Sequence, residues 1–201
     1  MNKNSLIFLM DFDGHPGLAD EFVENYRTYA LQDIINDSYL DREKCVIVST
    51  ALSSRGSNIE TRSAILCKQA VLDKGWTWLK VDKTKNFSYL VHELSKVGFT
   101  LSPEDTTIVY GGTNTSGCVL HSSNFSLNKF VGRGHFCQLY LPLCDDTQIA
   151  GITSFDRSQK AFALVYKYLK DKKYIDSVDM ITMYGELNLV KSDKRFDYIS
   201  T

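Results

Sequence analysis

The sequence has no excess of charge of either sign, no long hydrophobic run and no closely paired cysteines. Lys and Arg number 23 and Asp and Glu 24, for a formal net charge of -1, so electrostatics give no reason to expect nucleic acid or an anionic membrane as partner. The apolar run over 6–10 is too short for a signal peptide or a membrane span. Five cysteines without paired spacing fit a reducing compartment, and we expect a cytoplasmic protein.

Motifs for metal and nucleotide binding are also missing. The histidines, at positions 15, 92, 121 and 135, do not have the spacing that places two metal ligands on one helix face. No Gly-x-x-x-x-Gly-Lys loop for phosphate occurs, and no Cys-x-x-Cys pair, which disfavours a thiol redox protein. We therefore expect no metal site and no cofactor.

The composition is that of one ordinary globular domain. The 201 residues are 43% hydrophobic and 23% charged, which suffices for a sizeable core. No internal repeat and no linker rich in Pro, Gly and Ser divides the chain. We predict a single domain over residues 1–201, in which the polar stretch from about 186 to 201 is a tail or an oligomer contact.

Short apolar runs of strand length alternate with segments of helical periodicity. The predicted strands cover residues 6–10, 45–48, 76–81, 107–110, 136–141 and 178–183, and the predicted helices cover 18–35, 59–72, 87–97, 118–127 and 159–169. Strands buried on both faces and separated by helices are typical of an α/β domain. The pattern therefore predicts a mostly parallel sheet between layers of helices.

Three chemically distinct side chains follow three of these strands. Asp11 ends the first strand, Lys83 and Lys85 follow the third, and Cys118 follows the fourth after a glycine-containing turn. In open parallel sheets, ligands bind outside the carboxyl ends of the strands. The order along the chain thus predicts that a carboxylate, an ammonium and a thiol meet at one edge of the sheet.

The segment around Cys118 has the features that a nucleophilic cysteine requires. The strand over 107–110 stops at Gly111 and Gly112, and the cysteine falls in the expected first turn of the next helix. Free amide N–H groups and the helix dipole favour a thiolate there and can hold an oxyanion. The alternative is a buried structural cysteine, since free cysteines are often buried.

The order of these motifs resembles the isochorismatase-like cysteine hydrolases, which include nicotinamidases and N-carbamoylsarcosine amidases. The residues that carry the resemblance are Leu6–Asp11, Val81–Ser88 and Gly112–Leu120. The similarity extends over about residues 6–169. It implies a three-layer, Rossmann-like α/β sandwich, a small-molecule substrate and, as in many members of the family, a homo-oligomer.

Carried over to this chain, the resemblance implies that Cys118 is the nucleophile and Asp11 the general base. Lys83 would hold Asp11 ionised and stabilise developing negative charge. Each residue also has an ordinary structural interpretation. Asp11 could cap a helix or a turn, Lys83 could be a solvated surface lysine, and Lys85 competes with it for the catalytic position.

The same comparison implies four substrate-binding residues. Phe12 follows the general base, and Thr113, Asn114 and Gly117 belong to the turn before Cys118. The family implies a cis peptide bond between Thr113 and Asn114, which would direct backbone N–H groups toward the substrate oxygen.

Two departures from the family pattern limit the choice of substrate. Nicotinamidases carry an Asp-x-His metal pair after the second strand, whereas residues 49–54 here contain neither residue type. The stretch 12–16 also differs from the family sequence, which changes the pocket. We therefore predict a hydrolase of an amide or related C–N bond of a small molecule. The alternative is a catalytically silent relative that binds a small molecule or a protein.

Overall fold

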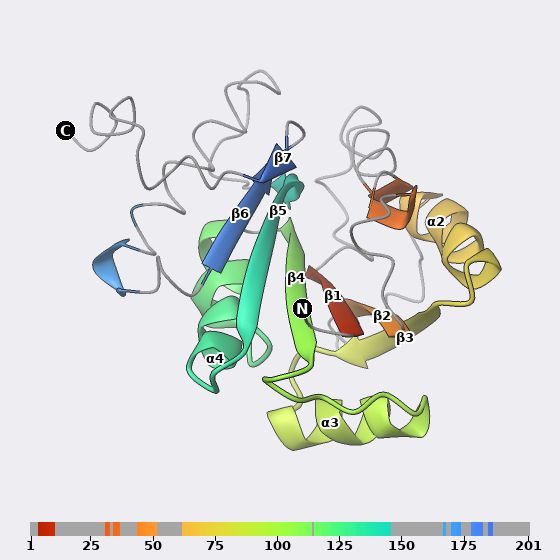
Figure 1. Ribbon diagram of the computed structural model, residues 1–201, viewed down its shortest axis with the longest axis horizontal. Coiled ribbons are helices and arrows are strands. Elements are labelled where there is room, and N and C mark those ends of the chain that lie inside the picture. The colour runs from red at the N-terminus through yellow and green to blue at the C-terminus, as the bar shows by residue number, and fades with distance from the viewer. Residues whose placement is uncertain are drawn as a thin grey trace.

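The computed structural model describes residues 4–10, 31–32, 34–36, 44–51, 62–113, 115–145, 167, 170–173, 178–182 and 185–186. Its centre is a seven-stranded sheet in the order β3-β2-β1-β4-β5-β6-β7 (Figure 1). The strands are β1 (Asn4–Met10), β2 (Lys44–Ala51), β3 (Thr77–Asp82), β4 (Thr106–Thr113), β5 (Phe136–Asp145), β6 (Val178–Thr182) and β7 (Gly185–Glu186). The helices are α2 (Arg62–Asp73), α3 (Phe87–Lys96), the π-helix η3 (Thr115–Ser122) and α4 (Leu127–Val131).

Among the described strands, β1 to β6 run parallel, and the short β7 pairs antiparallel with β6. Strand β1 pairs with β2 on one side and with β4 on the other. Strands β1, β2 and β3 follow one another outward in one direction, and β4, β5 and β6 in the other. The order therefore reverses between β1 and β4, which is the place where open α/β sheets bind ligands.

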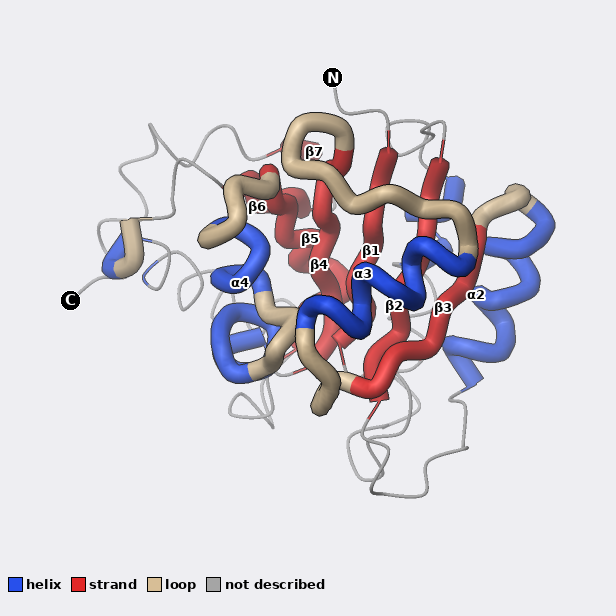
Figure 2. The backbone as a smooth tube through the Cα atoms, turned by 90° about the horizontal axis from the view of Figure 1, so that it is seen from below, coloured by secondary structure: helices blue, strands red, loops and turns tan. Residues whose placement is uncertain are grey.

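Helices cover both faces of the sheet (Figure 2). Side chains of α3, η3 and α4 join the cluster of buried residues on one face, and side chains of α2 join the cluster on the other. The two clusters follow the alternation along β1: Leu6 and Phe8 belong to the first, Ile7 and Leu9 to the second. The prediction of a mostly parallel sheet between layers of helices is confirmed. The single-domain assignment stays a prediction.

Several boundaries differ from those expected. The predicted helix over 118–127 is wrong, because η3 begins before Cys118 and ends at Ser122, and a separate helix, α4, follows. Glu186 was expected in a polar tail but pairs with Ile181 as part of β7. Most of the predicted helices over 18–35 and 159–169, and residues 187–201, lie outside the described residues.

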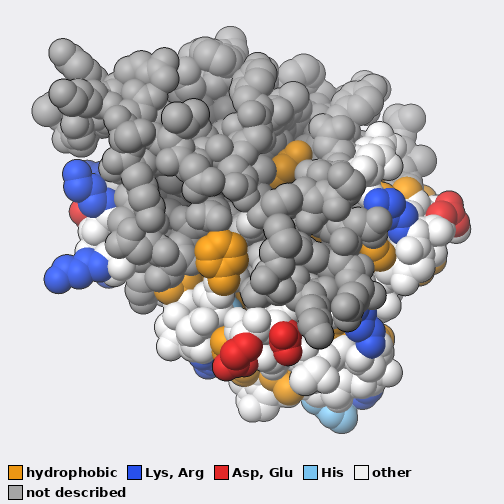
Figure 3. All heavy atoms as spheres, in the orientation of Figure 1, with side chains coloured by type: hydrophobic (Ala, Val, Ile, Leu, Met, Phe, Trp, Pro, Cys, Tyr) orange, Lys and Arg blue, Asp and Glu red, His pale blue; other side chains and the backbone are white. Residues whose placement is uncertain are grey.

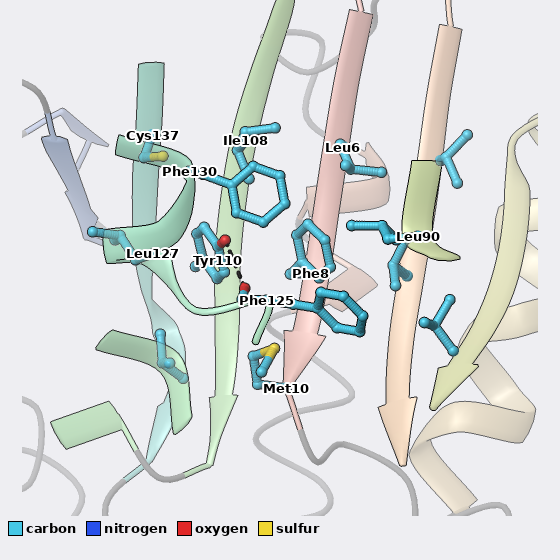
Figure 4. Packing of buried hydrophobic residues seen from close by; sticks show 14 of the residues in the cluster. Leu6, Phe8, Met10, Leu90, Ile108, Tyr110, Phe125, Leu127, Phe130 and Cys137 are labelled. Carbon is cyan, nitrogen blue, oxygen red and sulfur yellow. Dashed lines mark hydrogen bonds between the residues drawn. The ribbon is translucent and has the colours of Figure 1, made fainter. Parts of the chain in front are cut away.

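Aromatic rings fill the core beneath η3 and α4 (Figure 4). The rings of Phe8 and Tyr110 stack with centroids 5.3 Å apart, and Phe130 packs against Phe8 at 5.2 Å. The Tyr110 hydroxyl donates a hydrogen bond of 2.8 Å to the carbonyl of Phe125. Burial raises the pKa of the Tyr110 hydroxyl well above its ordinary value, so it remains a proton donor to this carbonyl. The bond ties β4 to the chain that follows η3.

Two glycines allow β4 to approach its neighbours. A Cβ on Gly111 would lie 2.5 Å from the Cβ of Leu143 on β5, and a Cβ on Gly112 would collide with the backbone of Met10 on β1. Gly112 also has a φ of +123°, which side chains disfavour. The expectation that these glycines end the strand is wrong. They lie within β4, where the register with β5 shifts between Tyr110 and Gly112.

Replacing Gly112 with alanine should destabilise the protein strongly. The added methyl group collides with rigid backbone, so overpacking of about 1–3 kcal/mol adds to a left-handed backbone cost of about 1–2 kcal/mol. Gly134→Ala is the matched control, because Gly134 also has a positive φ, +83°, but nothing lies within 4 Å of its added Cβ. Urea unfolding should show a clearly larger loss for Gly112→Ala, and equal losses would contradict the close-approach explanation.

His135, at the amino end of β5, is buried, and its Nδ1 has no hydrogen-bond partner in the described part of the chain. Its ring packs against Phe130 at 5.5 Å between centroids. Burial lowers the pKa of His135, and the positive charge of Arg133 lowers it further, while Glu104 opposes both. The folded protein therefore favours the neutral imidazole.

The His135 side chain should make the protein less stable in mild acid. Because its pKa is lower in the folded state, the unfolded chain takes up the proton first as the pH falls. The stabilising contribution is thus complete above the ordinary histidine pKa of about 6.5 and is lost as the pH falls through the folded value. Urea unfolding at pH 7.5 and 5.5 should show a smaller loss in His135→Leu than in the wild type. The same loss in both proteins would assign the effect to other groups.

Candidate active site

Lys83 lies in a tight turn between β3 and α3. The Lys85 N–H donates to the carbonyl of Asp82 at 3.1 Å and closes the turn. The carboxylate of Asp82 accepts from the backbone N–H of Thr84 at 2.9 Å and from its hydroxyl at 2.7 Å. A carboxylate that bonds to the backbone two residues later is a common way to fix a turn. The local sequence therefore holds the backbone of Lys83 before any tertiary contact is made.

Helix α3 extends this rigidity beyond the turn. Its N-cap is Asn86, whose side chain accepts from the Tyr89 N–H at 3.0 Å. Leu90 and Leu94, one helical turn apart, are buried against the sheet. The cap and these two anchors fix the point at which the turn meets the helix.

Cys118 lies in the first turn of η3, the helix that follows β4. The thiol is half-buried, while the next two side chains, Val119 and Leu120, are buried in the core below. The first amide groups of a helix have no acceptor within it. π-Helices are rare and occur often at functional sites. The segment thus places a partly exposed thiol at the amino-terminal end of a helix, where backbone N–H groups lack intrahelical acceptors.

The structure brings Lys83 and Cys118 together. The Lys83 ammonium donates to the Cys118 sulfur at 3.9 Å, a long contact suited to a large sulfur atom. Lys83, which is half-buried, is thus the lysine at the cysteine, whereas its competitor Lys85 is exposed.

The other predicted site residues are described only in part. Asp11, Phe12 and Asn114 lie outside the described residues. Thr113 is the last residue of β4, and Gly117 is half-buried in η3 directly before the cysteine. The cis peptide bond expected before Asn114 lies outside the described residues as well.

Sequence reasoning missed one residue beside the pair, Asn124. Its side-chain amide donates to the backbone carbonyls of Thr84 at 3.3 Å and Lys85 at 3.1 Å. These carbonyls belong to the turn of Lys83, and Asn124 follows η3 in the chain. No motif marks the residue in the sequence, because its partners are backbone atoms about forty positions away.

The remaining cysteines differ from Cys118 in their surroundings. Cys45, Cys67 and Cys137 are buried, whereas Cys144 is half-buried. Burial raises the pKa of Cys67 to about 11 and raises that of Cys137 further. Thiols of this kind are poor nucleophiles at neutral pH.

The described residues show two further absences. No group of three or more His, Cys, Asp or Glu side chains in the described ranges could hold a metal ion. Among the same residues, no helix is both long enough and apolar enough to cross a bilayer. On the face shown in Figure 3, the basic and acidic side chains of the described residues are dispersed rather than gathered by sign.

No protein-family model and no curated protein sequence matches this chain. Among solved structures, the nicotinamidase SaPncA from Staphylococcus aureus overlays on 85% of this chain and 96% of its own, with 11% sequence identity and a TM-score of 0.49. An overlay at this level carries no argument about family or activity.

Limited alkylation should identify Cys118 as the most reactive thiol. With substoichiometric iodoacetamide at pH 7, peptide mass spectrometry should find Cys118 modified at least about tenfold faster than Cys67 and Cys137, because burial keeps those thiols protonated. Cys144 is the internal control, since it is also half-buried. Faster labelling of Cys144 than of Cys118 would remove the reason to regard Cys118 as activated.

Proposed function

We propose that this chain is an isochorismatase-like hydrolase that cleaves an amide or related C–N bond of a small molecule through a thioester on Cys118. The observation that carries the proposal is the contact of 3.9 Å between the Lys83 ammonium and the Cys118 sulfur. It joins side chains that follow β3 and β4, at the carboxyl edge of a parallel sheet. The motif order of the sequence and the half-buried thiol support the same assignment.

In the proposed reaction, Asp11 takes the thiol proton and the Cys118 sulfur attacks the carbonyl carbon. Backbone N–H groups at the start of η3, including that of Gly117, stabilise the oxyanion. The C–N bond then breaks, the amine leaves with the proton from Asp11, and a thioester remains. Water, deprotonated by Asp11, attacks the thioester. The carboxylic acid product is released, and the Cys118 thiol is regenerated with the proton from Asp11.

The roles assigned to residues outside the described ranges rest on the sequence. Asp11 directly follows β1, whose last residue, Met10, pairs with Gly112 on β4. In the proposal, Lys83 keeps the Asp11 carboxylate ionised and stabilises the thiolate. Phe12, Thr113 and Asn114 contact the substrate. The cytoplasmic location and the homo-oligomer stay predictions.

A screen of small amides for ammonia release tests the activity. With a substrate in hand, Cys118→Ala should abolish turnover, because no thioester can form. Asp11→Asn should lower kcat by about 10²–10⁴-fold, since the amide keeps the shape but cannot accept a proton. The double variant should be no worse than Cys118→Ala, because both residues act on one step.

Two readouts accompany this experiment. Urea unfolding should confirm that the variants are folded, and rapid-quench mass spectrometry should detect the acyl group on the Cys118 peptide of the wild type. Full turnover by Cys118→Ala would refute the mechanism. Binding of the amides without turnover in any protein would instead favour a catalytically silent binding module.

A further inference from the structure

Strand pairing does not explain why Lys83 reaches Cys118. Strands β3 and β4 are separated by β2 and β1, so the two strands lie three spacings apart, about 14 Å. The turn that bears Lys83 must therefore cross the carboxyl ends of two strands to meet η3. Some contact other than the sheet has to hold it there.

Asn124 makes that contact. Its side-chain nitrogen donates to the carbonyl oxygens of Thr84 and Lys85, at 3.3 and 3.1 Å. Both partners are acceptors, so only the NH₂ group of the amide can serve both, and its two hydrogens match the two carbonyls. One side chain thus links the backbone after Lys83 to the backbone after Cys118.

Both ends of this link are rigid. On one side, the Asp82 carboxylate and the Lys85 N–H fix the turn. On the other side, Phe125, which follows Asn124, is fully buried, and its carbonyl accepts the bond from the Tyr110 hydroxyl. A hydrogen bond between two rigid segments fixes the distance between them. A hydrogen bond to a mobile loop would leave that distance free to vary.

We infer that Asn124 is a positioning residue that holds the Lys83 ammonium at the Cys118 sulfur. The inference rests on the proposed function, which assigns a catalytic role to the Lys83–Cys118 pair. Asn124, Thr84 and Lys85 are all exposed, so the link buries little surface and contributes little to the core. Its effect should therefore appear in the reactivity of the cysteine more than in the stability of the fold.

The test is the rate at which iodoacetamide alkylates Cys118 in the folded protein, followed by peptide mass spectrometry from pH 5.5 to 9.5. Asn124→Ala removes both donors, and Asn124→Asp keeps the shape but replaces the donors with acceptors. Both should slow alkylation at pH 7 by about three- to tenfold and move the pH profile of the rate upward, since the ammonium spends less time at the sulfur.

Asn128→Asp is the matched control. Asn128 lies in α4, and its side-chain oxygen accepts from the Ser126 hydroxyl, which an aspartate preserves while adding the same charge. This variant should alkylate at the wild-type rate. Lys83→Met should slow alkylation by itself, and adding Asn124→Ala to it should have no further effect, because the residue acts through the lysine.

Each other outcome overturns the inference. Wild-type rates in both Asn124 variants, or slowing in Asn124→Asp alone, would leave no positioning role. An equal loss with and without Lys83 would show that Asn124 acts on the fold rather than through the lysine. If Lys83→Met alkylates like the wild type, the role proposed for Lys83 in the reaction fails together with the inference. If Lys83→Met is slow and Asn124→Ala is not, only the inference fails.

Discussion

The close contact between β4 and β1 determines the arrangement of the candidate site. Gly112 lies against the backbone of Met10 with no room for a side chain, and this pair is the last one between β1 and β4. The two strands are therefore paired to the carboxyl end of β1, at the position in the sheet where the strand order reverses. η3 begins three residues later, at Thr115, so the pairing fixes the end of the strand from which the cysteine-bearing helix follows. A wider spacing at Gly112 would move the cysteine away from the edge where the other strands end.

The site combines local rigidity with a few long-range bonds. The turn of Lys83 is fixed by its own neighbours, above all by the carboxylate of Asp82. The chain after η3 is fixed from inside by the Tyr110 hydroxyl. Single hydrogen bonds contribute only about 1 kcal/mol each, but between segments that are already ordered they suffice to set a distance. The turn of Lys83 and the chain after η3 are thus held in place by hydrogen bonds, with little buried surface between them.

Much of the architecture could be predicted from the sequence, because buried parallel strands consist of short, continuous runs of apolar residues. The strand ends also predicted that Lys83 and Cys118 would face the same edge. The sequence did not reveal that Gly111 and Gly112 lie within β4, because the reason is the position of Leu143 and Met10 on neighbouring strands. The π-helical winding of η3 and the bonds of Asn124 were hidden likewise, since both depend on tertiary contacts rather than on a local pattern.

The pairing of β1 with β4 also has a consequence for how the protein is made. Residues that pair across these strands, such as Met10 and Gly112, are separated by about a hundred positions, and contacts this distant in the chain slow folding. During synthesis, one hydrogen-bonding edge of β1 has no partner until the ribosome has delivered β4. In that interval η3 and α4, whose side chains join the core on one face of β1, have not been made either, and unpaired strand edges are prone to aggregate. β1 is therefore completed only when β4 has been made, and its unpaired edge is open to wrong pairing until then.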